Sequence, residues 1–216
     1  AVTGVQTCAL PIYFLGKGST EIDVYGGYKN TFAGGDWNYD VGYITYNYPG
    51  SGPAIPTVLA KPNTQEAYGA IGYKWLTLKY SVATSKNFIG WYGGPGLNQN
   101  TRGSDYLELN ANYDLGSGWT LIGHYGHQKV KGSVTVAGVL PASYSDWKLG
   151  VSKDVGFGTV TVAYSATDVG GTCNGTTGGT SSYCWGSSNF VSGVGPSNGF
   201  TNVAKDKVVL QFVKNF

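Results

Sequence analysis

Hydrophobic and polar side chains alternate along most of this chain. Between residues 76 and 84, for example, Leu78 and Tyr80 alternate with Lys79 and Ser81. Because successive side chains of a β-strand point to opposite faces, this repeat predicts strands with one apolar and one polar face. Within 36–48 the phase of the alternation changes at Ile44, which predicts a bulge or an aromatic rim. The pattern predicts nine strands, at residues 20–30, 36–48, 66–74, 76–84, 104–113, 118–129, 144–153, 158–168 and 205–216.

Short and long connections alternate between these predicted strands. The short ones are tight turns at residues 30–36, 74–76, 113–118 and 153–158. The long ones are rich in Gly, Pro, Ser, Thr and Asn, at residues 48–66, 84–104, 129–144 and 168–205. A soluble sandwich or propeller has no reason to sort its loops in this way. A transmembrane β-barrel does, because its periplasmic turns are short and its extracellular loops are long.

The two faces of the predicted strands also favour a membrane barrel. The apolar face carries aromatic residues near the strand ends, as in the girdles where a barrel meets the membrane surface: Trp37, Tyr73, Trp75, Tyr113, Trp119 and Trp147. The other face carries charges in mid-strand, which a dry core would exclude and a wet lumen accommodates. The predicted fold class is therefore all-β, an antiparallel transmembrane β-barrel, with a lipocalin-like soluble barrel as the alternative. The residues expected to line the lumen are Glu21, Asp23, Lys29, Asp40, Glu66, Lys74, Lys79, Glu108, His124, Asp146, Lys148 and Lys207.

Composition narrows the class further. The chain has 216 residues with 35 Gly, 17 Tyr and 6 Trp, and only 12% of it is charged. No apolar run approaches the roughly 20 residues of a membrane helix. The hydrophobic fraction of 41% disfavours intrinsic disorder. A net charge of +2 with a single arginine, Arg102, provides no basic patch, so nucleic acid is not an expected partner.

The first residues are expected to lie outside the natural protein. Residues 2–12 (VTGVQTCALPI) look like the in-frame translation of a sequencing adapter, so we expect residues 1–13 to be non-native and 14–216 to form part of a barrel domain. A natural N-terminal loop is the alternative. In an antiparallel series of nine strands the first and last run in the same direction. We therefore expect either an open nine-stranded sheet or a barrel closed by a parallel pair, cut from a parent of ten or, better, twelve strands.

A set of short segments, in the order in which they occur, resembles a known family. The segments are residues 21–28 (EIDVYGGY), 40–46 (DVGYITY), 73–81 (YKWLTLKYS), 144–154 (YSDWKLGVSKD), 162–165 (VAYS) and 208–216 (VVLQFVKNF). Over residues 19–216 the chain resembles the TorF-family porins, hypothetical outer-membrane proteins of proteobacteria. The resemblance implies an outer-membrane location and a twelve-stranded barrel whose first three strands are missing here. The last strand also looks like an insertion signal for the barrel-assembly machinery, carried by Val208, Leu210, Phe212 and Phe216.

Catalytic chemistry is not predicted. His124 and His127 are three residues apart, so on a strand they face opposite ways and cannot form a two-ligand metal site. His124 and Glu108 could join a lumenal Ser81 or Ser152 in an acyl-hydrolase arrangement. Such residues occur in any polar lumen, however, so we expect no catalytic residue, no cofactor and no metal.

Two cysteines lie in the longest predicted loop. Cys173 and Cys184 are surrounded by Gly, Ser, Thr and Asn, which could not order the loop on their own. In an oxidising compartment a disulfide between them is favoured over a free pair or a metal site.

Two functions follow from this reading. The first is a passive outer-membrane channel for small hydrophilic solutes, with outer-membrane lipid around it. Near-balance of lumenal acids and lysines predicts weak ion selectivity. The second is a structural or adhesive surface protein with a closed lumen that acts through its long loops. Residues 88–92 (FIGWY) are its best candidate contact, unless this loop folds over the barrel mouth.

Overall fold

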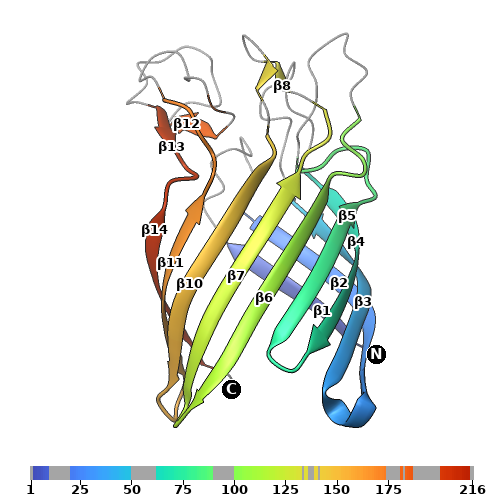
Figure 1. Ribbon diagram of the computed structural model, residues 1–216. Coiled ribbons are helices and arrows are strands. Elements are labelled where there is room, and N and C mark those ends of the chain that lie inside the picture. Colours follow the sequence, from blue (N-terminus) through green and yellow to red (C-terminus); the bar gives the residue numbers. More distant parts are fainter. Residues whose placement is uncertain are drawn as a thin grey trace.

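The molecule is built around one antiparallel sheet (Figure 1). The computed structural model describes residues 2–9, 20–49, 62–89, 100–132, 134–135, 139–140, 142–173, 181, 183–186 and 200–214. Ten strands pair in the order β1-β2-β3-β4-β5-β6-β7-β10-β11-β14. They are β1 (Val2–Ala9), β2 (Thr20–Phe32), β3 (Trp37–Asn47), β4 (Thr64–Tyr73), β5 (Leu76–Ala83), β6 (Asp105–Gly116), β7 (Trp119–Lys129), β10 (Tyr144–Asp154), β11 (Thr159–Thr167) and β14 (Lys207–Val213).

The remaining elements are small and lie in the connections. Two short hairpins pair β8 (Val134–Thr135) with β9 (Val139–Leu140), and β12 (Cys184–Gly186) with β13 (Phe200–Asn202). A single turn of 3-10 helix, η2 (Ala33–Gly35), connects β2 to β3. Among the described residues no helix is long and apolar enough to cross a membrane.

The predicted all-β antiparallel architecture is confirmed. Residues from Thr20 onward supply nine strands of the sheet, each paired antiparallel to its neighbours. The strands are tilted and the sheet curls around (Figure 1). Among the described strands no ladder joins β1 to β14, so the sheet is open. The open nine-stranded alternative therefore describes residues 20–214.

The head of the chain, predicted to lie outside the barrel domain, adds a tenth strand to the sheet. Val2–Ala9 pairs with β2 along its whole length, from Val2 opposite Gly27 to Ala9 opposite Thr20. The edge of β2 offers unpaired backbone groups that any extended segment can satisfy. That residues 1–13 are foreign to the natural protein stays a prediction.

Short and long connections lie at opposite ends of the sheet. The turns after β2, β4, β6 and β10 lie at the lower end in Figure 1, and β8, β12 and β13, which belong to the long connections, lie at the upper end. The turn between β6 and β7 shows why short turns fit here. Gly116, Ser117 and Gly118 have φ of 82°, 52° and 75°, a left-handed run for which glycine is the suited residue.

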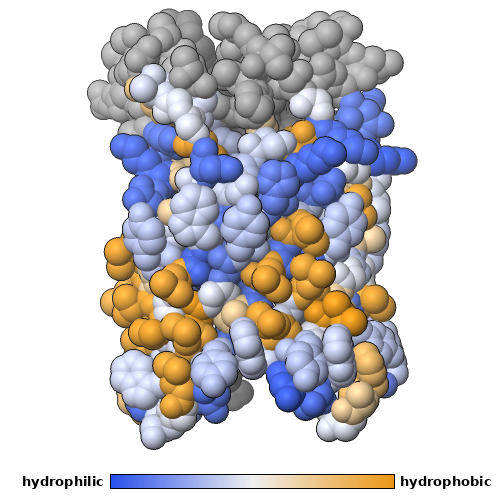
Figure 2. Space-filling model, in the orientation of Figure 1, coloured by the Kyte–Doolittle hydropathy of each residue, from blue (hydrophilic) through white to orange (hydrophobic). Residues whose placement is uncertain are grey.

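The outer face of the sheet is apolar and open, and the inner face is polar and more buried. On the outer face Leu149 is 63% and Leu210 75% exposed, whereas on the inner face Asp23 is 8% and Gln128 7% exposed. Figure 2 shows the outer apolar side chains gathered around the middle and lower part of the wall. A protein that folds in water normally has the opposite arrangement.

The predicted phase change in β3 is wrong. The pairing of β3 with β4 runs without a shift from Trp37 opposite Tyr73 to Tyr46 opposite Thr64. Ile44 and Tyr46 therefore belong to the inner face, where both line a cavity. Large side chains replace small polar ones on the same face, so the hydrophobic pattern changes at Ile44 while the pairing does not.

A small hydrophobic cluster lies at the long-loop end of the inner face. Phe88, from the segment after β5, is only 4% exposed and packs with Ala83, Val130 and Ala142. Tyr183 packs against this cluster and its hydroxyl donates a hydrogen bond to the carbonyl of Ala142. At Phe88 the loop thus folds over the end of the sheet. The rest of the predicted contact segment, residues 90–92, lies outside the described residues. We call these five residues the mouth cluster.

Replacing Phe88 should release this loop. Phe88→Ala removes a buried ring, a change that typically costs about 3–5 kcal/mol. Trypsin should then cut at Lys86 and Arg102 at least about tenfold faster, because local opening sets the cleavage rate. Ile89→Ala is the control, since the Ile89 side chain is 38% exposed. Equal cleavage rates in the two variants would show that the mouth cluster does not hold the loop.

Candidate functional site: the polar inner wall

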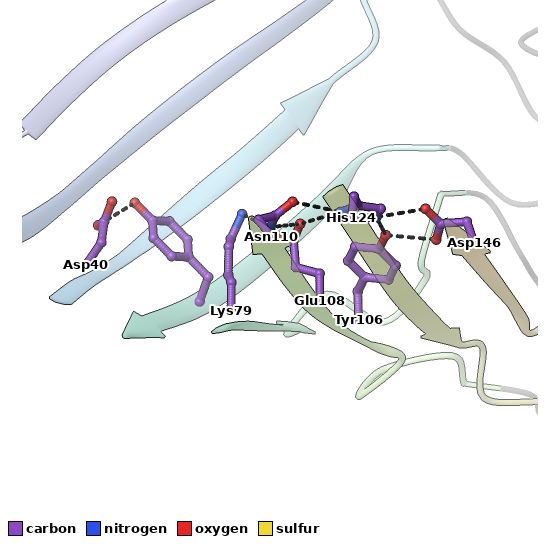
Figure 3. A network of polar contacts seen from close by, with 8 residues as sticks. Asp40, Lys79, Tyr106, Glu108, Asn110, His124 and Asp146 are labelled. Carbon is purple, nitrogen blue, oxygen red and sulfur yellow. Dashed lines mark hydrogen bonds and ion pairs between the residues drawn. The ribbon is translucent and has the colours of Figure 1, made fainter. Parts of the chain in front are cut away.

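The best-defined polar site is a network on three neighbouring strands, β6, β7 and β10 (Figure 3). Tyr106 donates a hydrogen bond to Asp146 Oδ1 at 2.8 Å, and its hydroxyl lies 2.9 Å from His124 Nε2. His124 Nε2 lies 2.8 Å from Asp146 Oδ2, and His124 Nδ1 lies 2.7 Å from Asn110 Oδ1. Asn110 in turn donates to Glu108 Oε2 at 2.8 Å. We call these five residues the histidine network.

The oxygens of the histidine network surround the ring of His124. The hydroxyl of Tyr106 donates to Asp146, and His124 Nε2 faces both this hydroxyl and Asp146 Oδ2. The amide of Asn110 gives its NH₂ to Glu108 and presents its oxygen to His124 Nδ1. Both ring nitrogens of His124 therefore lie within hydrogen-bond distance of oxygen atoms of the network.

The network continues to a lysine on the next strand. Lys79, on β5, lies 3.5 Å from Glu108 and directly opposite it in the ladder. Its ammonium also lies 5.1 Å from the centre of the Tyr68 ring. Basic and acidic side chains thus alternate along the wall in the order Lys79, Glu108, His124 and Asp146. Such an arrangement binds and orients polar groups.

Two inner tyrosines lie flat against the wall because glycines face them. A Cβ on Gly126 would overlap the Tyr106 hydroxyl, and a Cβ on Gly42 would lie 2.5 Å from the Tyr68 hydroxyl. Tyr106 crosses β7 above Gly126 to reach Asp146 on β10, which is the ladder partner of Gly126. Tyr68 crosses Gly42 and its hydroxyl donates to Asp40 at 3.2 Å. Glycine lets the ring approach the backbone closely.

A cavity of about 720 Å³ lies along β2 to β5 of the inner wall. Carboxylates of Asp40 and Glu66 line it, together with the rings of Tyr25, Tyr46 and Tyr68. The cavity therefore combines acidic groups with aromatic faces.

Most of the predicted lumenal residues lie on the inner face. The ladders put Lys29 opposite Asp40, Lys79 opposite Glu108, and His124 opposite Lys148. By the alternation along their strands these further residues share that face: Glu21, Asp23, Glu66, Asp146 and Lys207. His127 lies on the outer face, where its Nδ1 contacts Ser145 Oγ at 3.1 Å.

Lys74 is the exception among the predicted lumenal residues. It lies in the turn between β4 and β5 with a φ of 52°, and its ammonium lies 3.7 Å from Asp36 of the neighbouring turn. The chain reverses at Lys74, so its side chain never joins the inner alternation.

The predicted insertion signal and cysteines are placed only in part. Val208, Leu210 and Phe212 lie exposed on the outer face of β14, and Phe216 lies outside the described residues. Cys173 follows β11, while the side chain of Cys184 lies outside the described residues. The bridge between the two cysteines stays a prediction.

The inner tyrosines Tyr68 and Tyr106 are site residues that were not predicted from the sequence. Tyr68 and Tyr106 alternate in phase with Glu66 and Glu108, and this phase was the available signal. Their roles depend on cross-strand glycines that no single segment reveals.

The comparisons with known proteins identify a family. Residues 4–197 match the family described as "Bacterial protein of unknown function (Gcw_chp)". The chain belongs to the Gcw_chp family. No curated protein and no solved structure matches this Gcw_chp chain. Its resemblance to TorF-family porins stays a prediction.

A matched pair of glycine variants tests the histidine network. Gly126→Ala should displace Tyr106 and break its hydrogen bonds to His124 and Asp146, lowering the free energy of unfolding by about 1–3 kcal/mol. Gly123→Ala, on the same strand, should change it by less than about 0.5 kcal/mol. Its Cβ would meet only the Cβ of Ala111 at 3.5 Å. Denaturant unfolding of the detergent-solubilised protein measures both, and equal losses would contradict the tyrosine–glycine contact.

Proposed function

We propose that this Gcw_chp protein is an outer-membrane β-barrel porin whose polar inner wall passes small hydrophilic solutes. The observation that carries the proposal is the inverted distribution of side chains. Large apolar residues such as Leu149 and Leu210 are exposed on the outer face, and charged residues such as Asp23 and Asp146 lie on the inner face. Lipid stabilises the first arrangement, and water in a lumen accommodates the second.

The lengths and ends of the strands support the same proposal. β3, β7 and β10 each have 11 residues, close to the roughly 9–11 tilted residues that cross a membrane. On β7, Trp119 and Tyr125 flank Leu121 on the outer face. Near the short turns, aromatic rings contact one another, as in Trp37–Tyr73 at 4.7 Å and Trp75–Tyr113 at 5.6 Å between ring centres. These rings fit an interfacial girdle.

The polar contacts run along the wall between close strands. The histidine network joins β6, β7 and β10, and Lys79 extends it to β5. Among the described residues, the hydrogen bonds and ion pairs of this network join neighbouring strands and do not reach from one side of the curled sheet to the other. Because these charged side chains bind one another along the wall, they do not extend across the lumen. The lumen therefore has room for water.

The structural or adhesive alternative is less well supported. Its best contact was the segment 88–92, and Phe88 is buried in the mouth cluster. A buried ring is not available to a partner. We therefore propose the channel and not the structural or adhesive protein.

Single-channel recording tests the proposal. The full-length protein, reconstituted in planar lipid bilayers, should give stepwise ohmic conductance in KCl. Protein that inserts and shows heat-modifiable mobility on gels but gives no conductance step would overturn the channel and favour a closed structural barrel.

Two neighbouring residues on β11 test which face meets lipid. Val162 is exposed on the outer face, and Thr161 lies on the inner face opposite Gln211 and Ser152. Val162→Lys should weaken folding into bilayers by about 2–4 kcal/mol if the site lies near the membrane midplane, whereas Thr161→Lys should cost about 1 kcal/mol or less. Folding titrations into lipid vesicles measure both. For a protein that folds in water, the order of the two variants would reverse.

A further inference from the structure

We propose that the inner wall on β2 to β4 binds the ammonium group of small organic solutes. The inference rests on the proposed channel and names the class of solute that its wall favours. We call Glu21, Asp23, Asp40 and Glu66 the acidic wall; the cavity along β2 to β5 adjoins it.

The acidic wall brings carboxylates and tyrosine rings together through the register of three strands. Asp23 on β2 lies opposite Tyr46 on β3, and Glu66 on β4 lies opposite Ile44 on the same strand. Tyr46 therefore lies directly opposite Asp23 and diagonal to Glu66. Tyr25, opposite Ile44 on β2, adds a second ring. An organic cation gains from both carboxylates and ring faces.

The buried carboxylate of Asp23 points to a ligand. The residue is 8% exposed, and its Oδ1 has no hydrogen-bond partner among the described residues. A buried carboxylate oxygen without a hydrogen-bond partner costs free energy, because it has lost its hydrogen bonds to water, and the charge of the neighbouring Glu21 adds to the cost. A donor from a bound ammonium would remove this cost.

The cations on the wall leave the acidic wall undercompensated. Lys79 lies against Glu108 and the Tyr68 ring, and Lys74 lies in its turn beside Asp36. Lys29, opposite Asp40, is the remaining lysine on β2 to β4 that lines the cavity. Four carboxylates thus face two lysines on this part of the wall, Lys29 and Lys79, and Lys79 is shared with Glu108. The sequence-based expectation of weak ion selectivity included Lys74 among the lumenal lysines. Because Lys74 lies in a turn instead, the wall carries fewer positive charges, and the channel should favour cations.

The geometry favours an ammonium over a metal ion. Among the described residues no group of three or more His, Cys, Asp or Glu side chains converges closely enough to hold a metal. Asp23 and Glu66 lie instead on the outer two of three strands, with Tyr46 on the strand between them. An ammonium needs only one or two acceptors, and its alkyl part can lie against the rings.

Calorimetry on the full-length protein in detergent tests the site without requiring conduction. The probe is n-butylammonium, and n-butanol is its uncharged control of the same shape. We expect binding of n-butylammonium only, weakened about tenfold or more in both Asp23→Asn and Glu66→Gln. Asp36→Asn removes the same charge at a turn and should leave the affinity unchanged.

The outcomes separate this site from the channel itself. A wild-type protein that binds n-butanol as well as n-butylammonium, or an Asp36→Asn variant weakened as much as Glu66→Gln, would overturn the ammonium site.

In planar bilayers the wild type should prefer K⁺ over Cl⁻, and Glu66→Gln should lower that preference. If the protein binds n-butylammonium but conducts no ions, the channel fails and the site stands. If it conducts without binding the probe, the site fails and the channel stands. Gel mobility confirms that each variant is folded.

Discussion

The structure depends on the two-residue repeat of its strands. Because neighbouring side chains point to opposite faces, one sequence can carry an apolar and a polar surface a few ångströms apart. The pairing of β3 with β4 keeps this separation over ten consecutive residue pairs without a shift. A slip of one residue would exchange the two surfaces, so register and surface chemistry are a single property here.

The polar surface is stable because its charges are paired within it. Glu108, His124 and Asp146 are each less than a quarter exposed. At such burial an unpaired charge would be costly, whereas charge-assisted hydrogen bonds contribute about 1.5–3 kcal/mol each. The exposed pair of Lys74 with Asp36 is worth about 1 kcal/mol or less by comparison. The partly buried network, more than the turn, therefore holds the wall in one arrangement.

Much of the fold could be predicted from the sequence, because alternation is a local signal. It located the nine strands from Thr20 onward and put residues such as Lys79 and Glu108 on one face. It misplaced Lys74, because the positive φ that ends β4 leaves no mark in the alternation. The contact of Tyr106 with Asp146 was out of reach for another reason. It depends on which residue of β7 lies between them, and the long segment between β7 and β10 leaves that register open.

The crossing of β7 by Tyr106 has a consequence for assembly. The ring fits only where the intervening residue lacks a side chain, and Gly126 is that residue. A two-residue slip of β7 would keep the faces correct but bring His124 or Gln128 beneath the ring. Hydrophobic matching does not detect such an error, because the apolar residues still point outward. The fit of Tyr106 over Gly126 therefore favours the correct register of β6, β7 and β10 over a register shifted by two residues.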